Sequence, residues 1–497
     1  MSQTKFHITL ALLLAAAGVL IVRSATSASS PAAAAKPSTP AATANAPASV
    51  PIPATTAAPF FDGTPTPADK AVMAQADKDI EKYRKGDFTL TLVDPNGKPV
   101  AGKAVVAELE RHQFDFGTNS YGISAMKDDN PLKKIAQQTI LDIFNLVISV
   151  NYWHKDQTAE EADLVGKDLA WAGANGLRTR FHAVLYNDPK PIFVGKNLTT
   201  QQCWQLMEDR IRYVTAATGA KPMQYDVINE MVSKLTWDKD KPDAFMKLVP
   251  QFPDLTDPQV VKRVYDMVRK YLPSAHLVGL EAQIPSIHNP VYMQIIDYWK
   301  RCLAAGADID VIGTQCHFYA RDGLPFQQGS KDWGPDVFTM SGISMALDTL
   351  RSIGKPIVIT EFNGPSRNSH NKPDGWAKYW TMSEKENAAW QINFYKLAFS
   401  KPFIIGLTRW FQIDNVCGAG MDAGIIDGKG NKHQIYYDLK KLIKEEWHTR
   451  VVDKSSAAGK LAFRGFYGDY VVTVAGYKPA HITLDKGSGS LTVKLEK

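Results

Sequence analysis

The chain has 497 residues, of which 44% are hydrophobic, which is enough to bury a sizeable core and excludes wholesale disorder. Its 57 basic and 51 acidic residues give a formal net charge of +6, and the charges are interspersed along the sequence. Because nucleic-acid binders gather basic residues into a patch or stripe, we expect no nucleic-acid partner.

The N-terminus has the features of an export signal. Lys5 supplies positive charge, residues 8–22 form an apolar run, and small residues lead up to a possible cleavage site at Ala28. The run is 15 residues long, whereas a membrane span takes about 20 residues. The sequence therefore predicts a signal peptide over residues 1–28, a secreted or periplasmic location, and no stable membrane span after processing. An uncleaved anchor is the alternative.

Two segments precede the main part of the chain. Residues 29–67 are dominated by Ala, Pro, Thr and Ser, a composition that cannot bury a core and predicts an extended linker. Residues 68–111 are predicted to form a helix over 68–86 and then a β-hairpin, whose turn is Asp94-Pro95-Asn96-Gly97.

Residues 112–447 repeat one pattern, in which a helix ends near Gly, a short apolar strand follows, and a loop carries polar or aromatic residues. Strands of this kind are expected at 177–181, 309–312 and 357–360. One helix is predicted to begin with a capping box, because Thr199 is followed by Gln202 three residues later. About eight such βα units fit the span, so we predict an α/β fold, a closed (β/α)8 TIM barrel.

Residues 448–497 change character again. Short strands separated by Gly-rich turns are expected at 461–463, 470–474 and 491–495. Each flank of the barrel has too few strands to be stable alone, so we expect the N-terminal hairpin and this C-terminal β module to form one sandwich.

The cysteines indicate no metal site. Their positions are far apart and lack the pair spacing of metal ligands, at Cys203, Cys302, Cys316 and Cys417. We expect no metal and no organic cofactor, and the sequence leaves zero, one or two disulfide bridges open. We also expect a monomer.

Two glutamates follow apolar strands of the predicted barrel. Glu230 ends the strand over 225–229, and Glu361 ends the strand over 357–360. Active sites of such barrels lie at the carboxyl ends of the strands, so both side chains can reach one cleft. Glycoside hydrolysis needs two carboxyl groups that flank one bond. Either glutamate alone would more often be a solvated loop residue or a helix-capping carboxylate.

Five short motifs occur in a recognisable order at the strand ends: Arg180–Asn187, Tyr225–Glu230, Gly313–His317, Val358–Asn363 and Gly406–Trp410. They are similar to R-G-H-x-L-V-W-H, W-D-V-V-N-E, G-x-Q-x-H, I-T-E-L-D and G-x-T-x-W. Residues 112–447 therefore resemble glycoside hydrolase family 10, the endo-β-1,4-xylanase family, whose barrels are retaining. Each motif alone is weak, but the five together span the whole barrel.

The resemblance implies roles for individual residues. Glu230 would be the acid/base, Glu361 the nucleophile, and His317 the residue that orients the nucleophile. Asn229 would act with them by binding the sugar 2-hydroxyl. The remaining residues of the matched motifs would bind substrate: His182, Asn151, Tyr186, Gln315, Trp410, Asn363 and His154.

The sequence departs from the family where it would bind sugar. In the second-strand motif E-N-x-M-K-W, Val150 stands for the Glu and His154 for the Lys. Asn363 replaces an Asp, and Gly418 stands near the place of a second Trp. The implied substrate is a β-1,4-linked polysaccharide, either xylan or a related plant-type β-glycan.

We therefore predict a retaining glycoside hydrolase that acts by double displacement. A catalytically inactive barrel that binds carbohydrate is the first alternative. The second is that the terminal β strands are the part that binds glycan.

Overall fold

The computed structural model describes residues 64–153, 157–185, 190–230, 245–282, 285–319, 337–366, 382–414 and 423–497. The predicted signal peptide and all but the last residues of the predicted linker lie outside these ranges. Within the described part of the chain, no helix combines the length and the apolar character needed to cross a membrane.

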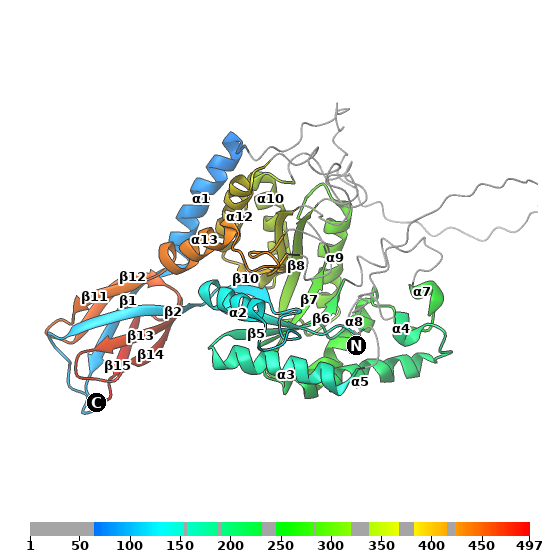
Figure 1. Cartoon of the computed structure of the whole chain (residues 1–497), viewed down its shortest axis with the longest axis horizontal. Helices are drawn as coiled ribbons and strands as arrows, with labels where there is room; N and C mark the ends of the chain where they lie inside the picture. Colours follow the sequence, from blue (N-terminus) through cyan, green and yellow to red (C-terminus); the bar gives the residue numbers. More distant parts are fainter. Residues whose placement is uncertain are drawn as a thin grey trace, which may run out of the picture. The chain divides into compact units, whose positions relative to one another are not determined.

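Eight parallel strands form a closed barrel, which confirms the predicted (β/α)8 architecture (Figure 1). Around the barrel the order is β10-β3-β4-β5-β6-β7-β8-β9. The strands are β3 Asp115–Asn119, β4 Leu146–Val150, β5 Arg178–His182, β6 Gln224–Asn229, β7 His276–Glu281, β8 Val311–Tyr319, β9 Ile357–Ser366 and β10 Ile404–Arg409. Consecutive strands are neighbours, so polar residues that follow different strands meet at one rim.

Helices connect the strands and surround the barrel: α2 Pro131–Ile143, α3 Ala159–Ala174, α4 Lys190–Phe193, α5 Thr200–Thr218, α7 Phe245–Leu248, α8 Pro258–Tyr271, α9 Pro290–Ala304, α10 Met340–Leu350, α12 Glu384–Ser400 and α13 Gln434–Lys441. The capping box at Thr199 and Gln202 is confirmed. Helix α5 ends at Gly219, whose φ of +58° suits the left-handed cap that the sequence predicts.

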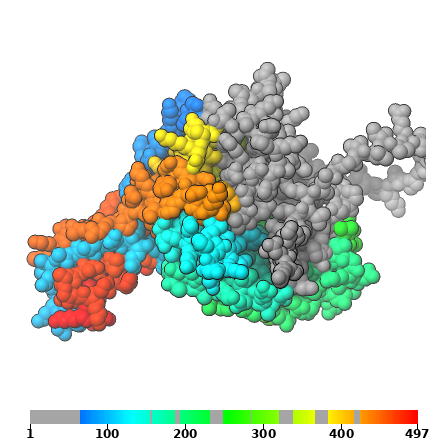
Figure 2. All heavy atoms as spheres, in the orientation of Figure 1, coloured from blue at the N-terminus to red at the C-terminus, as the bar shows by residue number. Residues whose placement is uncertain are grey.

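A small β module flanks the barrel and consists of two sheets. In one, β1 (Lys85–Val93) lies between β12 (Lys460–Phe466) and β15 (Ser490–Lys494). In the other, β2 (Ala104–His112) lies between β11 (Arg450–Lys454) and β13 (Gly468–Val474), and β14 (Ala480–Leu484) follows β13. Figure 2 shows the blue N-terminal and the orange to red C-terminal segments side by side. The prediction that both flanks build one accessory module is confirmed.

The predicted β-hairpin within residues 68–111 is wrong, because β1 and β2 belong to different sheets. The turn at Asp94 forms, with the Gly97 N–H donating to the Asp94 carbonyl at 2.9 Å. The chain then crosses to the other sheet. Both strands carry a fully apolar row, Phe88-Leu90-Leu92 in β1 and Val105-Ala107-Leu109 in β2. Placing the two rows in one core buries both, which a two-stranded hairpin cannot do.

The helix α1 (Pro67–Tyr83) and Arg84 attach the start of the chain to the barrel. Asp69 in the first turn of α1 accepts hydrogen bonds from the backbone and side chain of Ser341, at 2.7 and 2.8 Å. The Arg84 guanidinium donates to the carbonyls of Phe399, Lys401 and Ile404 at 2.5, 2.6 and 2.7 Å. Burial lowers the pKa of Arg84 to about 9, so the side chain stays cationic at neutral pH.

We expect Arg84→Ala to lower the free energy of unfolding by about 2–4 kcal/mol, because the charged-donor hydrogen bonds to three backbone carbonyls are lost. Chemical denaturation of the full chain measures this change. Arg464→Ala is the control, since its ion pair with Asp87 at 3.1 Å is exposed and is worth at most about 1 kcal/mol. Equal losses in the two variants would contradict the special role of Arg84.

Candidate active site

The two glutamates lie together at the carboxyl rim of the barrel. Glu230 directly follows β6, and Glu361 lies within β9. The side-chain nitrogen of Gln315, from β8 between them, donates to Glu230 Oε1 at 2.6 Å and to Glu361 Oε1 at 3.0 Å. The two carboxylate oxygens are therefore no further apart than the sum of these distances. That limit is close to the roughly 5–5.5 Å carboxyl separation of retaining glycosidases and below the roughly 6.5–9.5 Å of inverting ones.

The side-chain amide of Gln315 contacts both glutamates and Asn229. Its side-chain nitrogen also lies 3.2 Å from Asn229 Oδ1, so one amide group faces the acid pair and the neighbouring asparagine. Gln315 and Asn229 are each 1% exposed, which leaves little freedom for either side chain. The barrel rim therefore holds the two carboxyl groups at a fixed separation.

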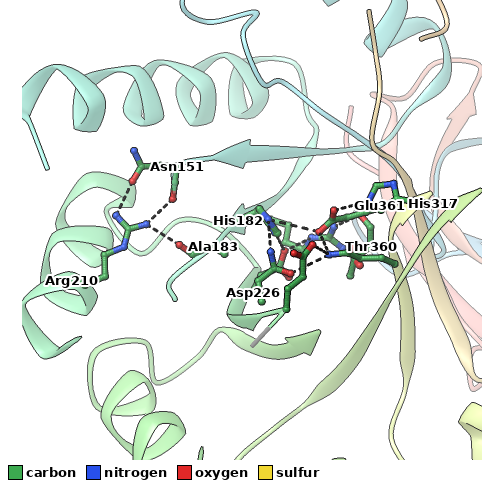
Figure 3. A network of polar contacts seen from close by, with 12 residues as sticks. Asn151, His182, Ala183, Arg210, Asp226, His317, Thr360 and Glu361 are labelled. Atoms are coloured by element: carbon green, nitrogen blue, oxygen red, sulfur yellow. Dashed lines mark hydrogen bonds and ion pairs between the residues drawn. The ribbon is translucent and has the colours of Figure 1, made fainter. Parts of the chain in front are cut away.

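Glu361 is enclosed by two histidines. It is 3% exposed, its Oε2 lies 3.0 Å from His317 Nε2, and its Oε1 lies 3.7 Å from His182 Nε2 (Figure 3). The other nitrogen of His317 contacts Asn363 Oδ1. Asn363 Nδ2 donates to the Gly364 carbonyl at 3.1 Å, so the amide oxygen is the end that faces His317. The asparagine that replaces the family's aspartate thus still fixes the orientation of this ring.

His182 ends β5 and is fully buried. Its Nδ1 lies 2.7 Å from Asp226 Oδ2, and its Nε2 lies 3.4 Å from Asn229 Nδ2. Asp226 in turn pairs with Arg180 Nε at 3.4 Å, and Arg180 donates to the Thr360 carbonyl at 2.8 Å. This chain of contacts joins three different barrel strands beneath the acid pair.

Asp226 and Arg180 are functional-site residues to which the motifs assigned no role. Both side chains are 0% exposed, Arg180 within β5 and Asp226 within β6. A signal for them exists in the sequence, because charged residues are almost never fully buried unless they are paired. Once both motifs are assigned to strands that line the barrel, Asp226 and Arg180 are therefore expected to pair, as they do at 3.4 Å.

The environment of Glu230 favours its protonated form. Burial raises the pKa of Glu230 above its ordinary value, and the nearby negative charge of Glu361 raises it further. The hydrogen bond from Gln315 and the proximity of His317 and His182 act in the opposite direction. Glu230 also has a φ of +58°, a left-handed conformation that is unfavourable for most residues other than Gly and is often retained at active sites.

Trp410 borders the same site. Its ring centroid lies 5.0 Å from that of His182 and 6.4 Å from that of His317, with the rings edge to face. It is 8% exposed and belongs to an apolar cluster that also contains Leu146 and Ile148. Trp410 therefore forms an apolar wall beside the two histidines.

Asn151 is placed differently from the other predicted site residues. Its side-chain oxygen accepts from Arg210 Nη1 at 2.8 Å, and Figure 3 shows it directed toward Arg210 and away from Glu361. The structure thus brings together eight predicted residues, Glu230, Glu361, Gln315, Asn229, His182, His317, Asn363 and Trp410. His154 and Tyr186 lie outside the described residues.

The described part of the chain contains no cluster of three or more His, Cys, Asp or Glu residues suited to a metal ion. Of the four cysteines, Cys203, Cys302 and Cys316 are buried and carry free thiols. Cys417 lies outside the described residues.

The fold and the site define a (β/α)8 barrel with a carboxylate pair at the carboxyl ends of its strands. The chain belongs to glycosyl hydrolase family 10, whose family model matches residues 117–437. Among solved structures, xylanase 10B from Thermotoga maritima aligns at a TM-score of 0.50 and 18% identity, over 67% of this chain and 96% of that one. A family 10 structure from Paenibacillus barcinonensis aligns at 0.51 and 20%, over 67% and 96%. These similarities support the fold.

Curated relatives are distant. The anti-sigma-I factor RsgI6 of Acetivibrio thermocellus is 24% identical over 84% of this chain and 49% of its own length. Endo-1,4-beta-xylanase 5 of Arabidopsis thaliana is 22% identical over 58% of this chain and 47% of its own length. The chain thus spans about half the length of these two relatives.

Proposed function

We propose that this protein is a retaining glycoside hydrolase that cleaves xylan or a related β-1,4-linked plant-type polysaccharide. The observation that carries the proposal is the single amide nitrogen of Gln315, which donates to a carboxylate oxygen of Glu230 and of Glu361. It keeps the two groups within the separation that double displacement requires. The xylanase names of several relatives support the substrate class.

In the first step, Glu361 attacks the anomeric carbon of the sugar while Glu230 donates its proton to the leaving glycosidic oxygen. A bond forms between Glu361 and the sugar, and the bond to the leaving oxygen breaks. In the second step, Glu230 removes a proton from water, which attacks the same carbon and releases Glu361. The raised pKa of Glu230 supports its role as the acid, since it must enter the reaction protonated.

The surrounding residues have supporting roles in this proposal. His317 orients the Glu361 carboxylate through the 3.0 Å contact, and Asn363 fixes the His317 ring. Asn229 and His182 bind hydroxyls of the sugar attached to Glu361, and Trp410 provides an apolar wall for its C–H face. We also propose export through residues 1–28 to a secreted or periplasmic location.

The test is hydrolysis by the full chain of a panel of β-glycans that includes xylan, with reducing-sugar release as the readout. Proton NMR of the first product formed identifies its anomer, and we expect the β-anomer because two inversions restore the starting configuration. Initial release of the α-anomer would refute double displacement.

A second candidate is a barrel that binds polysaccharide without cleaving it. The relative that matches 84% of this chain is called an anti-sigma factor, which is a regulatory name, and this observation favours the second candidate. Affinity electrophoresis on the same glycans separates the two functions. Retardation by a glycan that the protein does not hydrolyse over prolonged incubation would favour binding alone.

A further inference from the structure

Arg210 is a fully buried arginine of α5 whose donors are all used. It is 0% exposed, and each of its five N–H groups has an oxygen acceptor. Nε donates to the Val184 carbonyl at 3.0 Å, Nη1 to the side chains of Asn151 and Gln157 at 2.8 and 3.1 Å, and Nη2 to the carbonyls of Asn151 and Ala183 at 2.6 and 2.8 Å.

The acceptors lie at the ends of two adjacent barrel strands. Asn151 directly follows β4, and Ala183 and Val184 directly follow His182, the last residue of β5 (Figure 3). The backbone N–H of Asn151 also donates to the His182 carbonyl at 2.7 Å. Arg210 therefore holds the backbone that directly follows His182, and it also holds Asn151, whose N–H donates to the His182 carbonyl.

The Arg210 guanidinium is stabilised mainly by hydrogen bonds, with a further contribution from the negative charge of Glu161. Within the described residues, no carboxylate lies within ion-pair distance of its guanidinium, and its partners are neutral oxygens. Burial lowers the pKa of Arg210 to about 9, which leaves it cationic at neutral pH. A buried cation is unfavourable unless its hydrogen bonds are complete. A lysine, with three donors from one point, cannot reproduce five bonds to spread acceptors.

We propose that Arg210 is a positioning residue for catalysis, which acts by fixing the ends of β4 and β5 and thereby the His182 ring next to Glu361. This inference rests on the proposed function, because it assigns Arg210 a part in the same reaction. It also accounts for Asn151, whose side chain serves Arg210 and thereby the support of His182.

The molecule contains a matched control for a purely structural arginine. Arg84 also donates to several backbone carbonyls, and burial lowers its pKa to about 9 as well. Its acceptors, however, are the carbonyls of Phe399, Lys401 and Ile404, which precede or begin β10 at the opposite end of the barrel from the glutamates. Arg84→Lys and Arg210→Lys should therefore both lose stability, and only the second should alter the active site.

The first experiment compares the two variants with the wild type at a temperature where all three are folded by circular dichroism. We expect Arg210→Lys to lower kcat/KM on xylan by roughly 10- to 100-fold, mainly through kcat, because misplacement of a group by about 1 Å can cost that much. Arg84→Lys should stay within about twofold of wild type. Equal kinetics of the two variants would overturn the inference and leave the proposed function standing.

A second readout does not depend on turnover. In protein labelled with ¹⁵N-histidine, the side-chain signals of His182, assigned by their loss in His182→Gln, report the ring's hydrogen bonds. We expect these signals to shift or broaden in Arg210→Lys and to stay unchanged in Arg84→Lys. Unchanged His182 signals in Arg210→Lys would overturn the inference. Should the wild type hydrolyse no glycan, the proposed function fails and with it the catalytic part of the inference, and these spectra still decide whether Arg210 positions the His182 ring.

Discussion

Glu361→Ala is expected to lower kcat/KM on xylan on the order of 10⁵-fold, because no other described group can replace the nucleophile that forms the glycosyl intermediate. Sodium azide should restore part of the turnover of an activated aryl β-xyloside, since the small anion can enter the space that the carboxylate vacates. Attack from that side inverts the anomeric carbon, so the product should be the α-glycosyl azide. Proton NMR of the product measures its configuration.

Glu230→Ala gives the opposite product and serves as the internal comparison. With Glu361 intact, the α-linked glycosyl intermediate still forms from an activated substrate, and azide then attacks it from the other side. The expected product is the β-glycosyl azide. Glu446→Ala, at an exposed ion pair with Lys441, should behave like the wild type. Identical azide products from the two active-site variants would disprove the assignment of nucleophile and acid.

Glu230→Gln should abolish the alkaline limb of the pH profile of kcat/KM. In the wild type Glu230 must be protonated, so activity should be present below its raised pKa and fall as the pH rises through it. Glutamine cannot titrate, and it also cannot donate a proton. We therefore expect roughly a 10²- to 10⁴-fold loss on xylan, and a much smaller loss on aryl glycosides whose leaving group needs no protonation. A retained alkaline limb in the variant would assign that limb to another group.

The same substitution should stabilise the fold. A carboxyl whose pKa is higher in the folded than in the unfolded state adds stability below its unfolded pKa, and this stability is lost as the pH rises through the folded pKa. Glutamine does not ionise, so Glu230→Gln removes the loss of stability that ionisation of Glu230 causes as the pH rises. The variant should exceed the wild type by about 0.5–2 kcal/mol at neutral and alkaline pH and by less in acid. Denaturation at several pH values measures the difference, and a variant less stable at every pH would contradict the raised pKa.

The barrel and its acid pair were predictable because their signals are local. A short apolar run that ends in a glutamate identifies a strand and its rim residue together, as at Glu361. The same holds for Gln315 and His317, which lie in one strand, two positions apart, so that alternation places both side chains on the same face. The order of the motifs along the chain then indicated that these strand ends belong to one barrel and contribute to one site.

The supporting network was less predictable because it depends on distances across the barrel. Asp226 and Arg180 lie in motifs that the sequence identified, yet their pairing is a property of the closed sheet. Arg210 lies on α5 close to the exposed Arg212 and carries no local sign of its burial. The left-handed backbone of Glu230 is likewise set by its surroundings, since only Gly and Asn commonly signal such a conformation.

The prediction of an N-terminal β-hairpin was wrong for a related reason. The two N-terminal strands and the turn at Gly97 form as predicted, whereas β11 and β14 were not predicted and sequence proximity suggested the wrong partner for β1. Its neighbours are β12 and β15, which lie hundreds of residues further along the chain. Whether β1 and β2 pair with each other or join different sheets depends on the C-terminal strands. These strands supply the partners that allow the apolar rows of β1 and β2 to be buried in one core.

This interleaved module has a consequence for how the protein is made. In the register of β2 and β11, Glu108 faces Arg450, which the ribosome adds 342 residues later. Strands β1 and β2 therefore emerge during synthesis without partners, and pairing across so long a loop is intrinsically slow. Until strands β11 to β15 have left the ribosome, the nascent chain exposes the apolar faces and the unpaired edges of β1 and β2, which favours aggregation of this intermediate.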